Sequence, residues 1–431
     1  MKKLHFLFIL LLISLTSVAQ LSDFLKSQAQ IKSFEKITGN DFFNETWEIM
    51  MRQPLDHSDT SKGFFLQRVF VADKGKNNAV LLITEGYTAT YASRPTYINE
   101  LSPMLNSNQI CVEHRYFGKS WPDSLNWDYL TAVNAAADHH AVTQLFKNYY
   151  SGKWINTGIS KGGQTAVYHR AYYPDDVDVT VAYVCPLNFG VEDGRHEPFI
   201  ENVPGTPEIR KRIVEYQIAV LKKRDEFVTK LKEYSKEKKY TYRISMDEVL
   251  DYCVLEYPFA LWQWGKKIDE IPAKDASFEE LYNHLIEISG PSYFAIEDME
   301  SIRSFFVQAA RELGYYGYDT KPYKKYLSIK NAKNYLSKIF LPEDLNIRYD
   351  KSTAKYVKNY MKDTDNEILF IYGEWDPWSA SGFEVSEKDN LLKIIKPGGS
   401  HRTRINNLPE GQKVQVKNKL EEWLDLPVSI N

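Results

Sequence analysis

The stretch Gly158-Ile159-Ser160-Lys161-Gly162-Gly163 constrains the fold of this chain more than any other part of its sequence. An apolar run beginning at Trp154 precedes it, and a helix-like pattern follows from Lys161. A Gly-x-Ser-x-Gly motif between a strand and a helix is typical of a sharp turn that exposes the serine hydroxyl at the carboxyl end of a sheet. We therefore predict that Ser160 is a nucleophile. A plain strand-to-helix turn with a capping serine is the alternative.

Short apolar runs that alternate with helical stretches predict the sheet around this turn. The run at residues 79–84 is continuously apolar, as expected of a strand buried on both faces. Because strands alternate with helices, we expect an α/β fold with a doubly wound, mostly parallel sheet. Further strands are expected at 64–71, 109–113, 154–158, 177–184, 367–372 and 391–395, and helices at 130–149 and from 161 onward.

Residues 195–350 have a different character from the rest of the chain. They are rich in Lys, Glu and Tyr, and they contain few strand-like runs. Apolar pairs recur every seven residues from Ile213 to Tyr234, which marks one face of a helix, and 279–289 and 296–313 also have helical patterns. We expect residues 195–350 to form a helical lid domain inserted between the two parts of the α/β core, 20–194 and 351–431.

The first nineteen residues have the pattern of a signal peptide. Lys2 and Lys3 precede an apolar run at residues 6–15, and Ser17-Val18-Ala19 supplies small residues for cleavage after Ala19. The run is too short to span a bilayer as a helix, so no membrane partner is expected. We predict that residues 1–19 are removed and that the mature protein is secreted or periplasmic; an uncleaved anchor is the alternative.

Charge and cysteine content exclude several classes of function. Lys and Arg number 54 against 57 Asp and Glu, so there is no basic excess that would indicate a nucleic-acid partner. Cys111, Cys185 and Cys253 cannot all pair, and none stands in a CxxC motif, so we expect buried free thiols. His139-His140 lacks a nearby carboxylate pair to complete a metal site. We expect no metal and no cofactor, and the oligomeric state is left open.

A serine nucleophile needs a general base, and the base needs an orienting carboxylate. In a sheet of this kind the chain order is serine, acid, histidine, with the last two on loops after late strands. Asp376 follows the predicted strand at 367–372, with Glu374 as the competing carboxylate, and His401 follows the strand at 391–395. We predict that Ser160, Asp376 and His401 form a catalytic triad. A Ser-Lys mechanism that uses Lys161 is the less favoured alternative.

Acyl transfer also needs hydrogen-bond donors for the oxyanion. One donor is normally the backbone N–H of the residue after the nucleophile, here Lys161. The other comes from the loop after an early strand, here Thr84-Glu85-Gly86-Tyr87. Gly86 or Tyr87 is placed to supply it, and we predict an oxyanion hole made by Lys161 and the Gly86 region.

Several motifs, in this order along the chain, resemble those of a known family. Glu113-His114-Arg115-Tyr116-Phe117-Gly118-Lys119-Ser120 is similar to a signature shared by lysosomal prolylcarboxypeptidase and its relatives. Thr84-Glu85-Gly86 and Asp376-Pro377-Trp378-Ser379 match the same group. The Ser160-Lys161-Gly162-Gly163 form and the segment at 257–265 resemble the secreted bacterial serine aminopeptidases that release tripeptides.

The resemblance implies an α/β-hydrolase core, a helical lid and a triad that acts on peptides near a free amino terminus. Buried carboxylates that hold the substrate ammonium would explain such selectivity. Glu85 and Glu113 are candidates, and internal ion pairs with Arg115 or another base are the alternative. Four tryptophans are candidate walls of the binding site, with core packing as the alternative: Trp262, Trp264, Trp375 and Trp378.

These observations predict a secreted serine exopeptidase, similar to the tripeptidyl aminopeptidases, that cleaves short peptides from a free amino terminus through an acyl-enzyme. A triad does not distinguish an amide from an ester, so an esterase or lipase of the same fold is an alternative. A non-catalytic binding protein of this fold is a third possibility, which the complete order of serine, acid and histidine disfavours.

Overall fold

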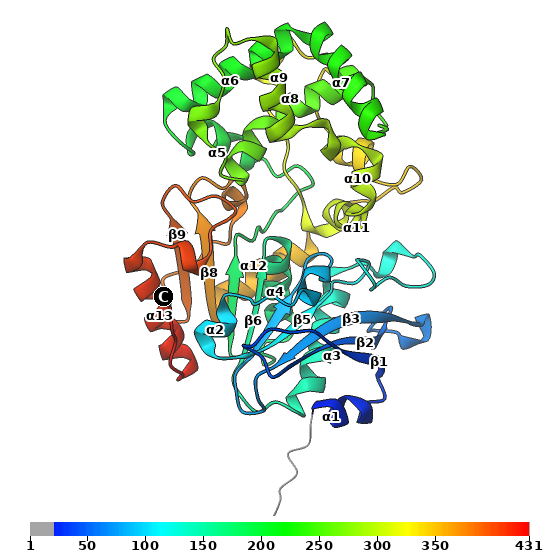
Figure 1. Ribbon diagram of the computed structural model, residues 1–431, viewed down its shortest axis with the longest axis vertical. Helices are drawn as coiled ribbons and strands as arrows, with labels where there is room; N and C mark the ends of the chain where they lie inside the picture. Colours follow the sequence, from blue (N-terminus) through cyan, green and yellow to red (C-terminus); the bar gives the residue numbers. More distant parts are fainter. Residues whose placement is uncertain (1–20, 431) are drawn as a thin grey trace, which may run out of the picture.

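A computed structural model describes residues 21–430 (Figure 1). The predicted signal peptide, residues 1–19, lies outside the described residues. Within these described residues, one sheet of nine strands has the order β1-β2-β3-β5-β4-β6-β7-β8-β9. The strands are β1 (Ile31–Ile37), β2 (Glu45–Pro54), β3 (Phe64–Asp73), β4 (Val80–Thr84), β5 (Asn108–Val112), β6 (Trp154–Ile159), β7 (Val179–Tyr183), β8 (Glu367–Gly373) and β9 (Leu391–Lys396).

The larger part of the sheet is parallel. Strands β5, β4, β6, β7, β8 and β9 pair in parallel, and β1, β2 and β3 join them through antiparallel pairing of β3 with β5. Every residue of β4 and β7 is buried, which explains their unbroken apolar sequences. The expected α/β fold with a doubly wound, mostly parallel sheet is confirmed. The antiparallel pair β1 and β2 was not predicted.

Helices cover both faces of the sheet (Figure 1). Successive residues of β4 point to opposite faces. Leu81 and Ile83 belong to the apolar cluster that includes residues of α13. Val80 and Leu82 belong to the cluster that includes residues of α3. Residues of α4 and α12 pack on β7 and β8 in a further cluster. The helices of the core are α1 (Leu21–Ser27), α2 (Leu101–Leu105), α3 (Ala132–Lys147), α4 (Lys161–Tyr172), α12 (Ser352–Asp363) and α13 (Glu410–Leu424).

The chain between β7 and α12 is helical and stands over one end of the sheet (Figure 1). It has an apolar cluster of its own, which includes Phe227, Leu250 and Leu281. Its α-helices are α5 (His196–Asn202), α6 (Pro207–Lys222), α7 (Arg224–Lys238), α8 (Met246–Gln263), α9 (Phe278–Ser289), α10 (Ile296–Glu300) and α11 (Arg303–Gln308).

Two of the expected helices in this part are divided. The apolar stripe from Ile213 to Tyr234 runs over α6 and α7, which are separated at Lys223. The stretch 296–313 consists of α10, α11 and a π-helical turn at Ala309–Leu313. A seven-residue repeat continues through a one-residue break because both helices face the same core, so periodicity alone does not locate the break.

Helix α8 contains Pro258, which has no N–H to donate to the carbonyl of Val254. The side-chain amide of Gln217, on α6, donates to that carbonyl at 2.6 Å instead. The Gln217 side-chain oxygen accepts from the hydroxyl of Tyr323 at 2.5 Å. Gln217 is buried, so one side chain satisfies the carbonyl that proline leaves free and ties three segments of the helical part together.

Cys111, Cys185 and Cys253 are buried free thiols. Within residues 21–430 no helix is both long and apolar enough to cross a membrane.

Candidate active site

Ser160 occupies a strained turn between β6 and α4. Its backbone has φ 57° and ψ −121°, a region that residues with a side chain rarely adopt. The Ser160 N–H donates to the carbonyl of Tyr183 on β7 at 2.8 Å, and its carbonyl accepts from the N–H of Gln164 at 2.9 Å. These bonds hold the strained residue at the carboxyl end of the parallel strands, where its side chain is partly exposed.

The glycines of the motif are required by close backbone contacts. A Cβ added at Gly158 would lie 2.2 Å from the carbonyl group of Gly162. A Cβ added at Gly162 would lie 2.7 Å from the carbonyl oxygen of Thr84 on β4. The glycines are therefore needed because β6, α4 and the end of β4 meet at the serine, with no room for a side chain at either glycine position.

His401 and Asp376 are hydrogen-bonded to each other. The Nδ1 atom of His401 lies 2.7 Å from Oδ2 of Asp376, and the other carboxylate oxygen accepts from the N–H of Trp378 at 3.2 Å. Asp376 is fully buried. With Nδ1–H donating to the carboxylate, Nε2 of His401 is left as an acceptor. Glu374 is exposed and accepts from the N–H of Gly398 at 2.7 Å, so it does not compete for the histidine.

Ser160 and His401 line the same cavity, which has a volume of about 790 Å³. It lies between the carboxyl end of the sheet and the helical part, and α8 contributes Glu256, Ala260 and Gln263 to its wall. The carbonyl of Gln263 also accepts from the N–H of His401 at 3.0 Å. The structure thus brings the predicted nucleophile and base to one cavity, holds the predicted acid behind the base, and fixes α8 against the histidine loop.

The residues predicted for the oxyanion hole lie next to each other. Lys161 begins α4, so its backbone N–H has no partner within the helix. Its side chain is buried, and Nζ donates to the carbonyl of Gly86 at 2.5 Å. A Cβ at Gly86 would lie 2.7 Å from both the Gly162 nitrogen and the Lys161 Cβ, which explains the glycine. Tyr87, the next residue, lines the cavity.

Glu85, at the end of β4, lines the cavity. It therefore meets the first requirement for a residue that binds the substrate ammonium. The hydroxyl of Tyr91 donates to its carboxylate. Burial raises the pKa of Glu85 to about 7. Glu85 is therefore a poorly solvated carboxylate, which gains from a cationic ligand.

Glu113 is not brought to the cavity. Its carboxylate pairs with Arg68 on β3, and it accepts from the N–H groups of Ala89 at 2.9 Å and Lys119 at 2.7 Å and from the Ser120 hydroxyl at 2.9 Å. It is a fully buried structural anion that holds β3 and two loops together. The proposed role in substrate binding is therefore replaced by the ion-pair alternative, with Arg68 as the partner. Arg115 pairs with Asp138 instead, at 2.7 Å.

Glu256 is a cavity residue that the sequence analysis missed. It lies in the middle of α8, is 6% exposed, and accepts from the hydroxyls of Tyr316 at 2.9 Å and Tyr318 at 2.8 Å. These partners are neutral, and burial raises the pKa of Glu256 to about 7. The sequence feature that could have indicated this residue is a single acid within the apolar stretch Val254-Leu255-Glu256-Tyr257-Pro258-Phe259. Acidic residues are almost never fully buried unless they have a partner or a ligand.

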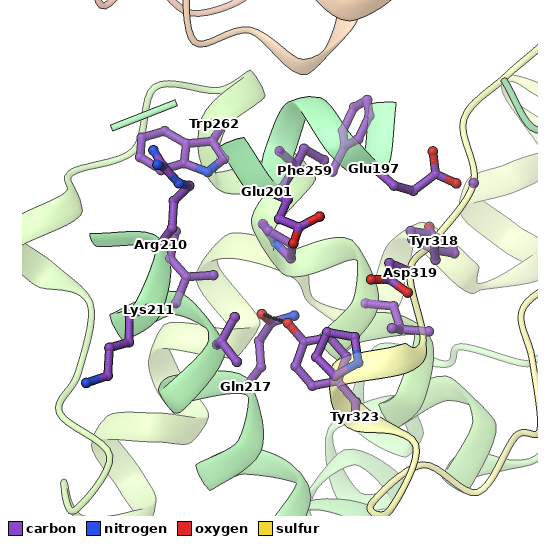
Figure 2. A pocket seen from close by; sticks show the side chains of 17 residues that line it. Glu197, Glu201, Arg210, Lys211, Gln217, Phe259, Trp262, Tyr318, Asp319 and Tyr323 are labelled. Atoms are coloured by element: carbon purple, nitrogen blue, oxygen red, sulfur yellow. Dashed lines mark hydrogen bonds between the residues drawn. The ribbon is translucent and has the colours of Figure 1, made fainter. Parts of the chain in front are cut away.

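Three of the four candidate tryptophans line two different cavities, and the fourth, Trp375, lines neither. Trp264 and Trp378 line the cavity that contains Ser160. Trp262 lines a second cavity of about 270 Å³ among α5, α6 and α8, which Figure 2 shows, and Trp375 packs on Trp262 with ring centroids 5.6 Å apart. Helix α8 separates the cavities, because residues 255, 258, 259 and 262 face the second one and residues 256, 260 and 263 face the first.

Potential metal ligands do not gather elsewhere in the molecule: among the residues that the structure describes, no group of three or more His, Cys, Asp or Glu side chains could hold a metal ion. His140 and His169 both contact Asp176, with Nδ1 of His140 and Nε2 of His169 at 2.8 and 2.9 Å. His139 contacts the carbonyl of Ala135 at 2.6 Å. These histidines link α3 to α4 and lie outside the cavity.

Comparison with known proteins gives matches over most of the chain. A model of the family described as PS-10 peptidase S37 matches residues 21–429. The prolyl tri/tetrapeptidyl aminopeptidase of Streptomyces mobaraensis is 29% identical over 429 residues, covering 95% of this chain and 88% of that protein. Human lysosomal Pro-X carboxypeptidase is 29% identical over 157 residues, 32% of each chain. The crystal structure of a proline iminopeptidase from Mycobacterium smegmatis matches 87% of this chain and 98% of its own with a TM-score of 0.42 and 12% identity.

Proposed function

The chain belongs to peptidase family S37 and is a serine peptidase of the α/β-hydrolase fold, and we propose that it is a secreted aminopeptidase that removes short peptides, tripeptides above all, from the free amino terminus of its substrates. Family membership favours the peptidase over the esterase and the binding protein. The observation that carries the aminopeptidase proposal is Glu256, a buried carboxylate with neutral partners in the wall of the cavity that contains Ser160.

In the proposed reaction Ser160 Oγ attacks the scissile carbonyl and gives its proton to Nε2 of His401. Asp376 orients the imidazole and stabilises the imidazolium, in keeping with the 2.7 Å contact between the two side chains. The oxyanion accepts hydrogen bonds from the N–H of Lys161 and from a second donor in the loop after β4. His401 then protonates the leaving amine, the acyl-enzyme forms, and a water activated by His401 releases the amino-terminal fragment.

A free amino terminus would supply a positive charge that Glu256 lacks and that Glu85 receives only from the buried Lys161 side chain. Burying a carboxylate without a cation is costly, and the raised pKa values of Glu85 and Glu256 express that cost. A blocked amino terminus would leave this cost unrelieved. Because Glu256 belongs to α8 and Ser160 to the turn between β6 and α4, the fold sets the distance between ammonium and scissile carbonyl, and so the length of the fragment released.

We extend the proposal to proline as the residue before the scissile bond. The name of the Streptomyces relative specifies a prolyl peptidase, and that of the human relative specifies a bond next to proline. The cavity offers aromatic walls at Tyr87, Phe305 and Trp378. Flat aromatic surfaces suit a rigid pyrrolidine ring, which has no N–H to satisfy.

Mass spectrometry of the products from a peptide library tests this function. The library contains each sequence twice, once with a free amino terminus and once acetylated, with and without proline at the third position. We expect tripeptide products from free, proline-containing members and none when the Ser160→Ala variant is used. Carboxy-terminal products, or equal cleavage of acetylated members, would contradict the aminopeptidase proposal. In the producing cell, the exported protein should begin at Gln20 by amino-terminal sequencing, and a retained leader would contradict secretion with cleavage.

A further inference from the structure

Lys161, the residue after the nucleophile, buries its cationic side chain directly beneath the active-site loop. The residue is 3% exposed. Nζ donates to the carbonyl of Gly86 at 2.5 Å and lies 5.5 Å from the ring centroid of Tyr87 and 5.1 Å from that of Phe117. Its hydrogen-bond and ring contacts are a carbonyl and two rings. Burial holds the pKa of Lys161 well below its usual range, although the carboxylates of Glu312 and Glu85 attract the side chain electrostatically. A buried ammonium of this kind costs stability, so the packing of the core alone gives no reason for it.

The contact with Gly86 sets the orientation of the next peptide unit. No cis peptide bond occurs in the described chain, and in a trans peptide the C=O and the following N–H point in opposite directions. Because the Gly86 carbonyl points toward the Lys161 ammonium, the N–H of Tyr87 points away from it. The carbonyl of Tyr87 is also held, since it accepts from the N–H of His114 at 3.1 Å. Both carbonyls that flank the Tyr87 N–H are therefore fixed.

Tyr87 lies on the cavity side of this loop, and Gly86 lies on the buried side. Tyr87 lines the cavity that contains Ser160 and His401. Gly86 packs against the nucleophile turn, and its nitrogen is 3.3 Å from the position that a Cβ on Gly162 would take. The Gly86 N–H is also engaged by the Glu85 carboxylate, which argues against the expected use of this N–H as an oxyanion donor.

We propose that the Lys161 side chain is a positioning residue: by holding the Gly86 carbonyl, it aims the backbone N–H of Tyr87, one of the two expected loop donors, at the oxyanion. The inference rests on the proposed function, because it assumes that Ser160 forms a tetrahedral intermediate. Lys161 then serves the oxyanion twice. Its own backbone N–H is the first donor, and its ammonium holds the peptide plane that presents the second.

Lys161→Met tests the positioning role, because it keeps the backbone N–H and most of the side-chain volume and removes only the ammonium. Loss of one oxyanion donor costs about 10²–10³-fold in kcat. We expect a loss of that order in kcat, with KM nearly unchanged. We also expect a parallel weakening of binding for a tripeptide boronic acid, whose adduct carries the tetrahedral oxygen. Lys161→Arg, which keeps a donor, should recover part of kcat.

Lys393→Met is the matched control. Lys393 also donates to a carbonyl, that of Phe383 at 2.8 Å, and lies 4.9 Å from the ring centroid of Tyr372, away from the cavity. It should leave kcat and boronate binding at wild-type values. A Lys161→Met protein with wild-type kcat, or one in which boronate and unreactive peptide lose affinity equally, overturns the inference while leaving the proposed function intact. A wild-type enzyme without Ser160-dependent peptide hydrolysis overturns both.

A crystal structure of the wild-type enzyme with the same boronic acid gives a second test that does not depend on the folding of a variant. The inference predicts the boronate oxygen within hydrogen-bond distance of the backbone nitrogens of Lys161 and Tyr87. An oxygen bound to the Gly86 nitrogen, or to neither loop residue, would overturn it.

Discussion

Replacing Glu256 by Gln should make the protein more stable and less active, and both effects follow from the same buried charge. Burial raises the pKa of this carboxyl from 4.5 to about 7. At roughly 1.4 kcal/mol per pH unit, ionised Glu256 therefore costs the folded state about 3 kcal/mol above pH 7. Because the folded-state pKa is the higher one, the folded protein binds the proton more tightly than the unfolded chain. Stability from this group is thus full below pH 4.5 and is lost as the pH rises through 7.

The glutamine side chain keeps an oxygen that can accept from Tyr316 and Tyr318, and it carries no charge. Chemical denaturation of wild type and Glu256→Gln at pH 8 should show the variant more stable by up to about 3 kcal/mol. At pH 4 the two proteins should be nearly equal in stability. This pH dependence separates the charge effect from any change in packing, which would appear at both pH values.

Activity should change in the opposite direction. A charge-assisted hydrogen bond contributes about 1.5–3 kcal/mol, so the variant should lose about 10- to 150-fold in kcat/KM on a peptide with a free amino terminus. The same peptide with the amino group replaced by hydrogen should lose little. Because wild-type Glu256 is protonated at low pH, the preference of the wild type for the charged substrate should itself decline below about pH 7, and Glu256→Gln should lack that decline.

Glu312→Gln is the matched control for this pair of effects. Burial also raises the pKa of Glu312, which accepts from the N–H of Ala132 at 2.7 Å and from the Thr353 hydroxyl at 2.9 Å and does not line the cavity. It should change stability without changing the preference for a free amino terminus. The reasoning fails if Glu256→Gln is less stable than wild type at pH 8, or if it slows both substrates equally.

Two further predictions concern carboxylates whose roles the structure separates. Asp376→Asn should lower kcat by about 10⁴-fold, because an amide does not hold the required tautomer of His401; Glu374→Gln should stay close to wild type in the same assay, and the reverse order would move the acid to Glu374. Glu113→Gln leaves buried Arg68 without its counter-charge and should cost about 3–5 kcal/mol in a denaturation experiment. When equal amounts of folded variant and folded wild type are compared, the KM for a peptide with a free amino terminus should be the same. A selective rise in KM would show that Glu113 binds substrate.

The local parts of the site could be predicted from the sequence because their physics is local. Crowding at Gly158 and Gly162 leaves a motif, and a strand buried on both faces leaves an apolar run, so the turn at Ser160 and most parallel strands could be located. The order of residues along the chain predicted Asp376 and His401, and these two side chains are hydrogen-bonded to each other in the structure. Strand β1 is largely exposed, and the mostly buried strand β2 mixes charged residues such as Glu48 and Arg52 with apolar ones, so neither gave a comparable pattern.

The acids of the cavity depend on packing between distant segments, and local patterns do not describe that packing. Glu85 and Glu113 both follow strands of the same sheet. Glu113 forms an ion pair with Arg68 from β3, whereas Glu85 faces the cavity. Glu256 reaches the site only because α8 crosses the end of the sheet, where Gln263 binds the backbone of His401. The sequence shows that residue 256 is an acid, but local patterns do not predict the packing of α8 that places this acid at the cavity.

The most direct test of the central claim is the site of covalent labelling by a fluorophosphonate, mapped by peptide mass spectrometry. A serine activated by His401 and Asp376 should give one adduct, on Ser160. That adduct should be absent in Ser160→Ala and strongly slowed in His401→Ala, since the base that activates the hydroxyl is then missing. An adduct on another residue, or full peptidase activity in a protein that takes no label at Ser160, would contradict the account.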